Sequence, residues 1–207
     1  MNENNLVYEL DNKVYINLTN ACSNNCVFCI RSIKEDVVGT NLFLTSENVE
    51  AEDVIAQLEE FKDKLGEEVV FCGYGEPLIK LRTLETVAKY IKKKYPKVKI
   101  RVNTNGQASL ILKKDVPKEL ANYVDKVSVS LNAENENMYN TLAQPAYENS
   151  YAAVKKFIAD CVKYGIDTTA TVVTGYKNYK IDVDKCKEIA ESLGAKFRER
   201  PWLDSGY

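Results

Sequence analysis

The sequence predicts an α/β fold with a parallel sheet, because short apolar runs alternate with segments of helical periodicity. Six runs rich in β-branched residues are the predicted strands, at 14–18, 69–72, 98–102, 127–131, 169–173 and, more weakly, 195–198. The chain has 207 residues. A complete eight-unit barrel needs about 250 residues, so six β/α units, as an open sheet or an incomplete barrel, suit this length better.

Helices are predicted between the strands, where apolar residues recur at helical spacing over 54–65, 84–95, 151–162 and 183–193. Gly66, Gly165 and Gly194 follow three of these stretches, at the position where a glycine commonly ends a helix. A shorter helix is predicted over 113–122. No linker-like, low-complexity or repeated segment interrupts the pattern, so we expect residues 1–207 to form a single domain.

Composition excludes several kinds of chemistry and location. The chain has no histidine, which rules out Ser-His-Asp and Cys-His catalysis and a histidine-ligated zinc. A formal net charge of −2 argues against tight non-specific binding to nucleic acid. The N-terminal segment does not read as a signal peptide, and no apolar run approaches the roughly 20 residues of a membrane span. We therefore expect a cytoplasmic protein with reduced thiols and no membrane contact.

Three of the six cysteines lie in one loop, residues 20–31, directly after the first predicted strand. Cys22, Cys26 and Cys29 have the spacing C-x3-C-x2-C, at the strand end where parallel α/β folds bind ligands. Iron–sulfur clusters usually have four cysteine ligands, so a cluster held by three keeps one iron open to a small molecule. A three-cysteine zinc site and a chance grouping of thiols remain alternatives. Cys161 and Cys186 lie on apolar helix stripes and are predicted core residues.

Together with Phe28, next to the last cysteine, this loop resembles the signature of the radical S-adenosylmethionine (radical SAM) superfamily. The segment 71–77, after the second strand, looks like the Gly-Gly-Glu motif of that family, with Tyr74 in place of the usual first glycine. The segment 103–106, after the third strand, is similar to its Thr-Asn-Gly turn. The resemblance covers nearly the whole chain and implies a partial (β/α)6 TIM-like barrel with parallel strands.

The resemblance also implies cofactors and site residues. Cys22, Cys26 and Cys29 would bind a 4Fe–4S cluster whose fourth iron binds SAM, and reductive cleavage of SAM would give a 5′-deoxyadenosyl radical that abstracts hydrogen from an unidentified substrate. The positions that match SAM contacts of the family are Phe28, Gly73, Gly75, Glu76, Asn103, Ser130, Asn132 and Val173. No catalytic side chain is assigned.

The short chain and its two motifs, L-T-N-x-C-x3-C-x-F-C and F-C-G-x-G-E-P, most resemble the TatD-associated radical SAM proteins. This narrower resemblance implies a TatD-type hydrolase as a partner, and the superfamily resemblance implies an electron donor such as flavodoxin or ferredoxin. No cysteine cluster follows Cys186, so we expect no C-terminal auxiliary-cluster domain. Arg198 and Arg200, at the last strand, are candidates to hold an anionic substrate or the carboxylate of SAM. A role for Cys72 near the substrate stays open.

Four other functions remain as alternatives. Glycyl-radical-enzyme activases are also short, but they usually carry S-G-G-E-P and a D-x-K at the fourth strand, where this chain has residues 73–77 and 130–132. A 7-carboxy-7-deazaguanine synthase normally has a different cysteine loop. A zinc-binding structural or partner-docking module, and a redox-inactive SAM-binding partner of the hydrolase, belong to other classes of protein.

Overall fold

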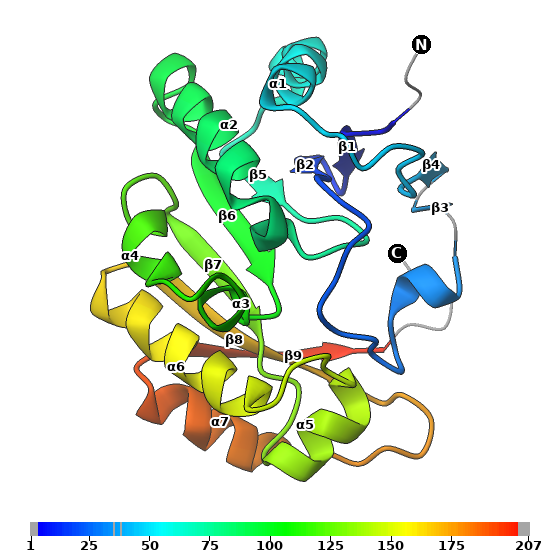
Figure 1. Cartoon of the computed structure of the whole chain (residues 1–207), viewed down its shortest axis with the longest axis vertical. Coiled ribbons are helices and arrows are strands. Elements are labelled where there is room, and N and C mark those ends of the chain that lie inside the picture. Colours follow the sequence, from blue (N-terminus) through cyan, green and yellow to red (C-terminus); the bar gives the residue numbers. More distant parts are fainter. Residues whose placement is uncertain (1–3, 35, 38, 203–207) are drawn as a thin grey trace.

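The computed structural model describes residues 4–34, 36–37 and 39–202 and has the predicted α/β architecture (Figure 1). Its main sheet has seven strands in the order β1-β2-β5-β6-β7-β8-β9. Their bounds are Val7–Leu10 (β1), Lys13–Ile16 (β2), Glu68–Phe71 (β5), Lys99–Thr104 (β6), Lys126–Ser130 (β7), Asp167–Thr174 (β8) and Lys196–Pro201 (β9). In this sheet, all strands except β1 are parallel, and these six correspond to the predicted strands. Strands β1 and β9 are the two edges. The sheet is thus a partial barrel, not a closed one.

The helices of the described chain alternate with these strands, and α2, α4, α6 and α7 lie along the outer side of the sheet (Figure 1). Their bounds are Ala51–Glu60 (α1), Leu81–Lys94 (α2), Ala108–Leu112 (α3), Val116–Leu120 (α4), Glu136–Ala143 (α5), Ser150–Lys163 (α6) and Val183–Ser192 (α7). Short 3-10 turns cover Ile30–Ser32, Lys62–Lys64 and Pro77–Lys80, and a small ribbon pairs β3 (Asp36–Val37) with β4 (Thr40–Asn41). No helix in the described ranges is long and apolar enough to cross a membrane.

Some local predictions are wrong. The predicted helix over 113–122 is the shorter helix α4, Val116–Leu120, and Lys113 lies outside it with a left-handed backbone (φ 52°) at the end of α3. Gly66 does not end a helix in the left-handed conformation, since α1 stops at Glu60 and a 3-10 turn follows. Gly165 and Gly194, with φ of 80° and 79°, do so as predicted.

Strand β1 and helix α5 are among the elements that lie outside the predicted set. Strand β1 pairs antiparallel with β2 through a tight turn in which Asp11 and Asn12 both have positive φ, as short hairpin turns require. Helix α5 follows β7 and buries Tyr139, Leu142 and Ala143. Its eight residues carry too few apolar side chains to give a clear helical stripe.

The two faces of the sheet differ in polarity, because successive side chains of a strand point to opposite faces. On β7, Val127 and Val129 are buried, and Val129 lies near Val154 of α6. Burial of each such side chain contributes about 1.5–3 kcal/mol. Lys126, Ser128 and Ser130 alternate with them and therefore face the concave side of the sheet. Polar side chains thus line the inside of the partial barrel.

Candidate functional site

The three-cysteine loop leaves the end of β2 and is held by helix α5 and the turn after it. The backbone amides of Asn25 and Val27 donate to the carbonyls of Ala143 (3.1 Å) and Leu142 (2.9 Å), near the C-terminal end of α5. These bonds satisfy carbonyls that the last turn of a helix leaves without internal partners. Helix α5, which the sequence did not reveal, is therefore one support of the loop.

Residues just before the first cysteine fix the other end of the loop. The carboxylate of Glu47 accepts hydrogen bonds from Thr19 Oγ1 (2.7 Å) and from the backbone amide of Asn20 (2.8 Å). The side chain of Asn20 bonds both the carbonyl and the amide of Leu44 (2.8 and 2.9 Å). The Leu-Thr-Asn segment before Cys22 thus anchors the loop to residues 44–47.

Cys22, Cys26 and Cys29 are free and partly buried, and their charges would interact with one another. Burial raises the pKa of Cys22, and burial followed by repulsion from Cys29 and Cys22 raises the pKa of Cys26 to about 12. The thiols of Cys22 and Cys26 are therefore neutral at pH 7 unless a bound cation or cluster stabilises the thiolates.

The thiol positions bear on which metal group would fit. Within the described residues, no three Cys, Asp, Glu or His side chains are arranged to hold a metal ion. A structural zinc usually has four ligands that converge on one point, whereas the loop offers three cysteines. Thiolates that each bind a different iron of a cluster have no such common point, and the loop supplies only cysteine donors, as clusters require.

The second motif approaches the loop through its two glycines. A Cβ atom on Gly75 would lie 2.2 Å from the carbonyl oxygen of Thr19 and 2.6 Å from that of Ala21, so no larger residue fits there. A Cβ on Gly73 would lie 2.0 Å from Asn17 Oδ1. Because Gly75 lacks a side chain, the next residue can donate its backbone amide to Ala21 O at 2.8 Å.

Glu76 is buried at the end of this motif and bonded on both oxygens. Oε1 accepts from Thr104 Oγ1 (2.7 Å) and the backbone amide of Leu78 (3.1 Å), and Oε2 accepts from the amide of Asn105 (2.7 Å). Burial raises the pKa of Glu76 to about 7, and the three hydrogen bonds oppose this shift. A cationic ligand beside the carboxylate would lower its pKa again.

The turn after β6 joins the second motif to the cysteine loop. While the backbone amide of Asn105 bonds Glu76, its side-chain amide donates to Ser23 Oγ (2.8 Å) and lies 3.8 Å from Cys22 Sγ. Gly106 has a φ of 77°, and its missing Cβ leaves room for Val129. The Thr-Asn-Gly turn therefore contacts both predicted motifs.

Sequence reasoning missed Gln107, which is fully buried behind this turn. Its Nε2 donates to Asn24 Oδ1 (2.6 Å) in the cysteine loop and to the hydroxyl of Tyr139 (2.8 Å) on α5. The sequence places Asn105 and Gln107 in or next to the Thr-Asn-Gly motif, and Asn24 in the cysteine loop. Only the fold shows that side-chain hydrogen bonds join these two segments.

The strand-end residues predicted to contact SAM lie on three neighbouring strands. Asn103 pairs with Ser128 across β6 and β7, and Ser130 pairs with Thr171 across β7 and β8. Asn103 Oδ1 is buried, with no hydrogen-bond partner among the described residues. An acceptor of this kind suits a ligand that brings a donor.

The other two predicted positions follow β7 and end β8. Asn132 is buried with a φ of 63°, and its backbone amide donates to Thr171 O at 3.1 Å. Val173 is partly buried beside the core and pairs with Arg200 of β9. The structure thus brings Gly73, Gly75, Glu76 and the cysteine loop together, and places Ser130, Asn132 and Val173 further along the same strand ends.

Phe28 lies in an aromatic group at the far side of the loop. Its ring is buried and meets Tyr176 edge-on, with centroids 6.2 Å apart, and Trp202 packs edge-on against the same tyrosine at 5.0 Å. The loop is therefore also packed against residues at the ends of β8 and β9.

The remaining cysteines divide as the sequence suggested. Cys161 and Cys186 are fully buried in the core of α6 and α7. The Cys72 thiol directly follows β5, and burial raises its pKa, which the nearby side chain of Asn103 opposes. Cys72 is thus next to a predicted SAM-contact residue.

Comparison with known families gives one match. A family model described as the radical SAM superfamily matches residues 16–193, which include the three cysteines, Glu76, the Thr-Asn-Gly turn and the ends of β7 and β8. No curated protein matches the chain.

Solved structures share the fold at low identity. SuiB of Streptococcus suis bound to precursor peptide SuiA matches with a TM-score of 0.69 and 16% identity, over 96% of this chain and 41% of that one. SuiB bound to S-adenosylmethionine matches with 0.65 and 18%, over 91% and 38%. The methyltransferase TsrM of Kitasatospora setae, with cobalamin and a 4Fe–4S cluster bound, matches with 0.61 and 13%, over 90% and 36%. The chain spans about two fifths of the length of these proteins.

Proposed function

Because the chain belongs to the radical SAM superfamily, we propose that it is an enzyme that binds a 4Fe–4S cluster and SAM. The observation that carries this proposal is the hydrogen-bonded connection of three motifs. Asn105 bonds Glu76 through its backbone amide and the cysteine loop through its side chain. A lone cysteine loop would not need a buried carboxylate tied to it in this way.

We assign the cluster to Cys22, Cys26 and Cys29. Three cysteines leave one iron without a protein ligand, and the chain has no histidine that could take that place. The hydrogen bonds from α5, Glu47 and Leu44 hold both ends of the loop. Burial of the thiols excludes water from the cluster and so protects it.

The second part of the proposal concerns SAM. Glu76 presents an ionised acceptor to the ammonium group of SAM, and Gly73 and Gly75 keep the backbone beside the loop free of side chains. Asn103, Ser130 and Asn132 offer neutral groups for the ribose hydroxyls and the carboxylate. Val173 offers an apolar contact for adenine, and Phe28 supports the loop from behind.

When bound, the cluster supplies one electron that cleaves SAM, and the 5′-deoxyadenosyl radical formed takes a hydrogen atom from the substrate. The protein residues bind and orient SAM and exclude water. SAM-bound and cluster-bound neighbours with the same fold support this assignment. One neighbour is bound to a precursor peptide, so a peptide is one candidate class of substrate.

The narrower parts of the proposal concern location and partners. A reductant such as flavodoxin or ferredoxin would supply the electron in the cytoplasm. The Leu-Thr-Asn segment before Cys22 and the segment 71–77 support membership of the TatD-associated group, with a TatD-type hydrolase as partner. Copurification of the chain with a hydrolase encoded beside it tests this point, and failure to associate in a direct binding assay would contradict it.

Anaerobic reconstitution with iron and sulfide tests the main proposal. We expect about four iron and four sulfide per chain and release of 5′-deoxyadenosine that depends on SAM and on a reductant. Cys26→Ala should lose both the cluster and this release. Cys161→Ala is the matched control, because Cys161 is a fully buried core thiol, and it should retain both.

Other outcomes select the alternatives. A colourless protein that retains one zinc per chain would favour the zinc-binding module, which the family match does not support. A cluster-loaded protein that binds SAM without cleaving it would favour a redox-inactive partner. Formation of a glycyl radical on an added enzyme would favour the activase.

A further inference from the structure

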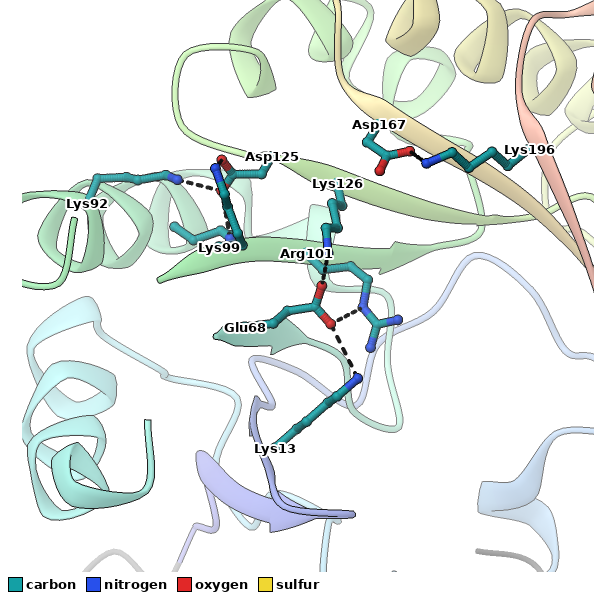
Figure 2. Close-up of polar contacts among 10 residues, drawn as sticks. Lys13, Glu68, Lys92, Lys99, Arg101, Asp125, Lys126, Asp167 and Lys196 are labelled. Carbon is teal, nitrogen blue, oxygen red and sulfur yellow. Dashed lines mark hydrogen bonds and ion pairs between the residues drawn. The ribbon is translucent and has the colours of Figure 1, made fainter. Parts of the chain in front are cut away.

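A polar pocket opens on the concave face of the sheet, at the amino ends of the strands and thus away from the cysteine loop. Its volume is about 270 Å³, and side chains from β2 and from β5 to β9 line it. Figure 2 shows the charged residues of this region, with Lys13, Arg101 and Lys126 gathered around Glu68. None of these residues belongs to the proposed cluster and SAM site.

Positive charge exceeds negative charge in this pocket. Four cationic residues line it, Lys13, Arg101, Lys126 and Arg198, against two acidic ones, Glu68 and Asp167. Asp167 is also bound by Lys196 at 2.7 Å, outside the lining. Three of the four lining cations, Lys13, Arg101 and Lys126, share the carboxylate of Glu68.

Glu68 is the centre of this group. Its carboxylate lies 3.0 Å from Lys126 Nζ, 3.3 Å from Arg101 Nε and 3.7 Å from Lys13 Nζ. Burial works to raise its pKa, but Lys126 and Arg101 outweigh this and hold the pKa below its ordinary value. Glu68 is thus ionised and neutralises only part of the surrounding charge.

The pocket also contains side-chain donors that make no hydrogen bond with the described part of the protein. The side chain of Arg101 is 15% exposed, and its buried Nε lies 3.3 Å from the Glu68 carboxylate as an ion pair that lacks hydrogen-bond geometry. The hydroxyls of Ser128 and Thr169 line the same pocket, and neither bonds another part of the described chain. Buried donors of this kind normally have a partner, and a guanidinium matches the geometry of an oxyanion.

We propose that this pocket binds an oxyanion, a phosphate or carboxylate group of a small substrate, through Arg101, Lys126 and Arg198, with Ser128 and Thr169 donating hydrogen bonds. The idea that the bound molecule is the substrate rests on the proposed function, whereas anion binding itself does not. When no anion is bound, the carboxylate of Glu68 forms the ion pairs with Arg101 and Lys126.

The position of the pocket suits a substrate that reaches the SAM site. Arg101 and the predicted SAM contact Asn103 are two residues apart on β6 and point to the same face, which places them roughly 7 Å apart along the strand. Arg198 and Arg200 have the same relationship on β9. A small molecule anchored at the pocket would thus extend along the concave face towards the strand ends.

The test is calorimetric titration of the anaerobically reconstituted protein, at low salt, with inorganic phosphate and with succinate as separate probes. We expect saturable binding of one of them, and the one that binds identifies the anion. Arg101→Gln should weaken it by about ten-fold or more. Glu68→Gln should strengthen it by about ten-fold, because an internal competitor for the cations is removed. Lys89→Met is the matched control, since Lys89 pairs with Glu85 on the exposed face of α2, and it should change nothing.

A purely structural ion-pair network predicts the opposite result for Glu68→Gln. Absence of binding by both probes, or weaker binding by Glu68→Gln, would overturn the inference. Lys126→Met serves if Arg101→Gln does not fold, and retained tight binding in Lys126→Met would also count against it. Anion binding without reductive SAM cleavage in the wild-type protein would overturn the proposed function alone, and SAM cleavage without anion binding would overturn this inference alone.

Discussion

The carboxylate of Glu76 accepts a hydrogen bond from the backbone amide of Asn105 at 2.7 Å, across 29 positions of the sequence. Thr104 adds a second bond at 2.7 Å. The end of β6 and the glycine motif after β5 are neighbours because β5 and β6 pair in parallel. A carboxylate at this point can therefore respond to ligand binding and hold two strand ends together.

Glu76 should make stability depend on pH. Its pKa is about 7 in the folded protein and 4.5 in its unperturbed state, so the folded protein binds more protons between these values. The free energy of unfolding should then fall as pH rises from about 4.5 to about 7, by up to about 3 kcal/mol. Urea denaturation of wild type and Glu76→Gln across this range measures the effect as the difference between them. A pH-independent difference would contradict it.

SAM binding should show the reverse dependence, because only ionised Glu76 attracts an ammonium group. Affinity for SAM should rise as pH increases towards about 7 and then level off, whereas Glu76→Gln should bind weakly at every pH. Equilibrium binding to the cluster-loaded protein tests this. Equal SAM affinity of the two proteins at neutral pH would remove Glu76 from the SAM site.

Gly75→Ala should distort the junction of the glycine motif and the cysteine loop. The new methyl group would meet two backbone carbonyls, those of Thr19 and Ala21, which cannot rotate away as a side chain would. We expect a loss of about 2–4 kcal/mol in chemical denaturation and a reduced iron content. Gly66→Ala is the matched control, because open space surrounds Gly66, and wild-type behaviour of Gly75→Ala would show that the close approach is unimportant.

Asn135→Ala should loosen the cysteine loop from a distance. Asn135 Oδ1 accepts from the amide of Met138 (2.9 Å) and caps α5, whose C-terminal carbonyls hold Asn25 and Val27. Loss of the cap should cost about 1 kcal/mol and speed hydrogen exchange of those two amides. Asp182→Ala removes the equivalent cap of α7 and should leave their exchange unchanged, so equal effects of the two substitutions would argue against the coupling.

Much of this fold and site could be predicted because it depends on local patterns. The buried parallel strand β5 reads as an apolar run, and β6 reads as an alternation of apolar and polar residues. Gly165 and Gly194 end their helices where the stripes stop. The clustering of Cys22, Cys26 and Cys29 also needs no knowledge of the fold. The family match covers these features apart from Gly194, which directly follows the matched residues.

The parts that were missed depend on contacts between distant segments. Helix α5 has only a short apolar stripe, and its role appears when its carbonyls meet the cysteine loop. Gln107 follows a glycine turn and reads as a loop residue, yet it is fully buried between Asn24 and Tyr139. Likewise, Glu68 and Arg101 look like ordinary strand-end charges until the parallel register brings them onto one face.

Asn105 offers a test of the cluster environment that does not depend on the substrate. Its side-chain amide lies 3.8 Å from Cys22 Sγ, and an N–H group near a thiolate stabilises the more negative, reduced form of a cluster. Asn105→Ala should therefore lower the reduction potential, by about 20–60 mV if the contact contributes about 0.5–1.5 kcal/mol. A redox titration followed by electron paramagnetic resonance measures the shift, with Asn122→Ala, on the exposed end of α4, as the control. An unchanged or raised potential in Asn105→Ala would mean that Asn105 positions the loop through Ser23 alone.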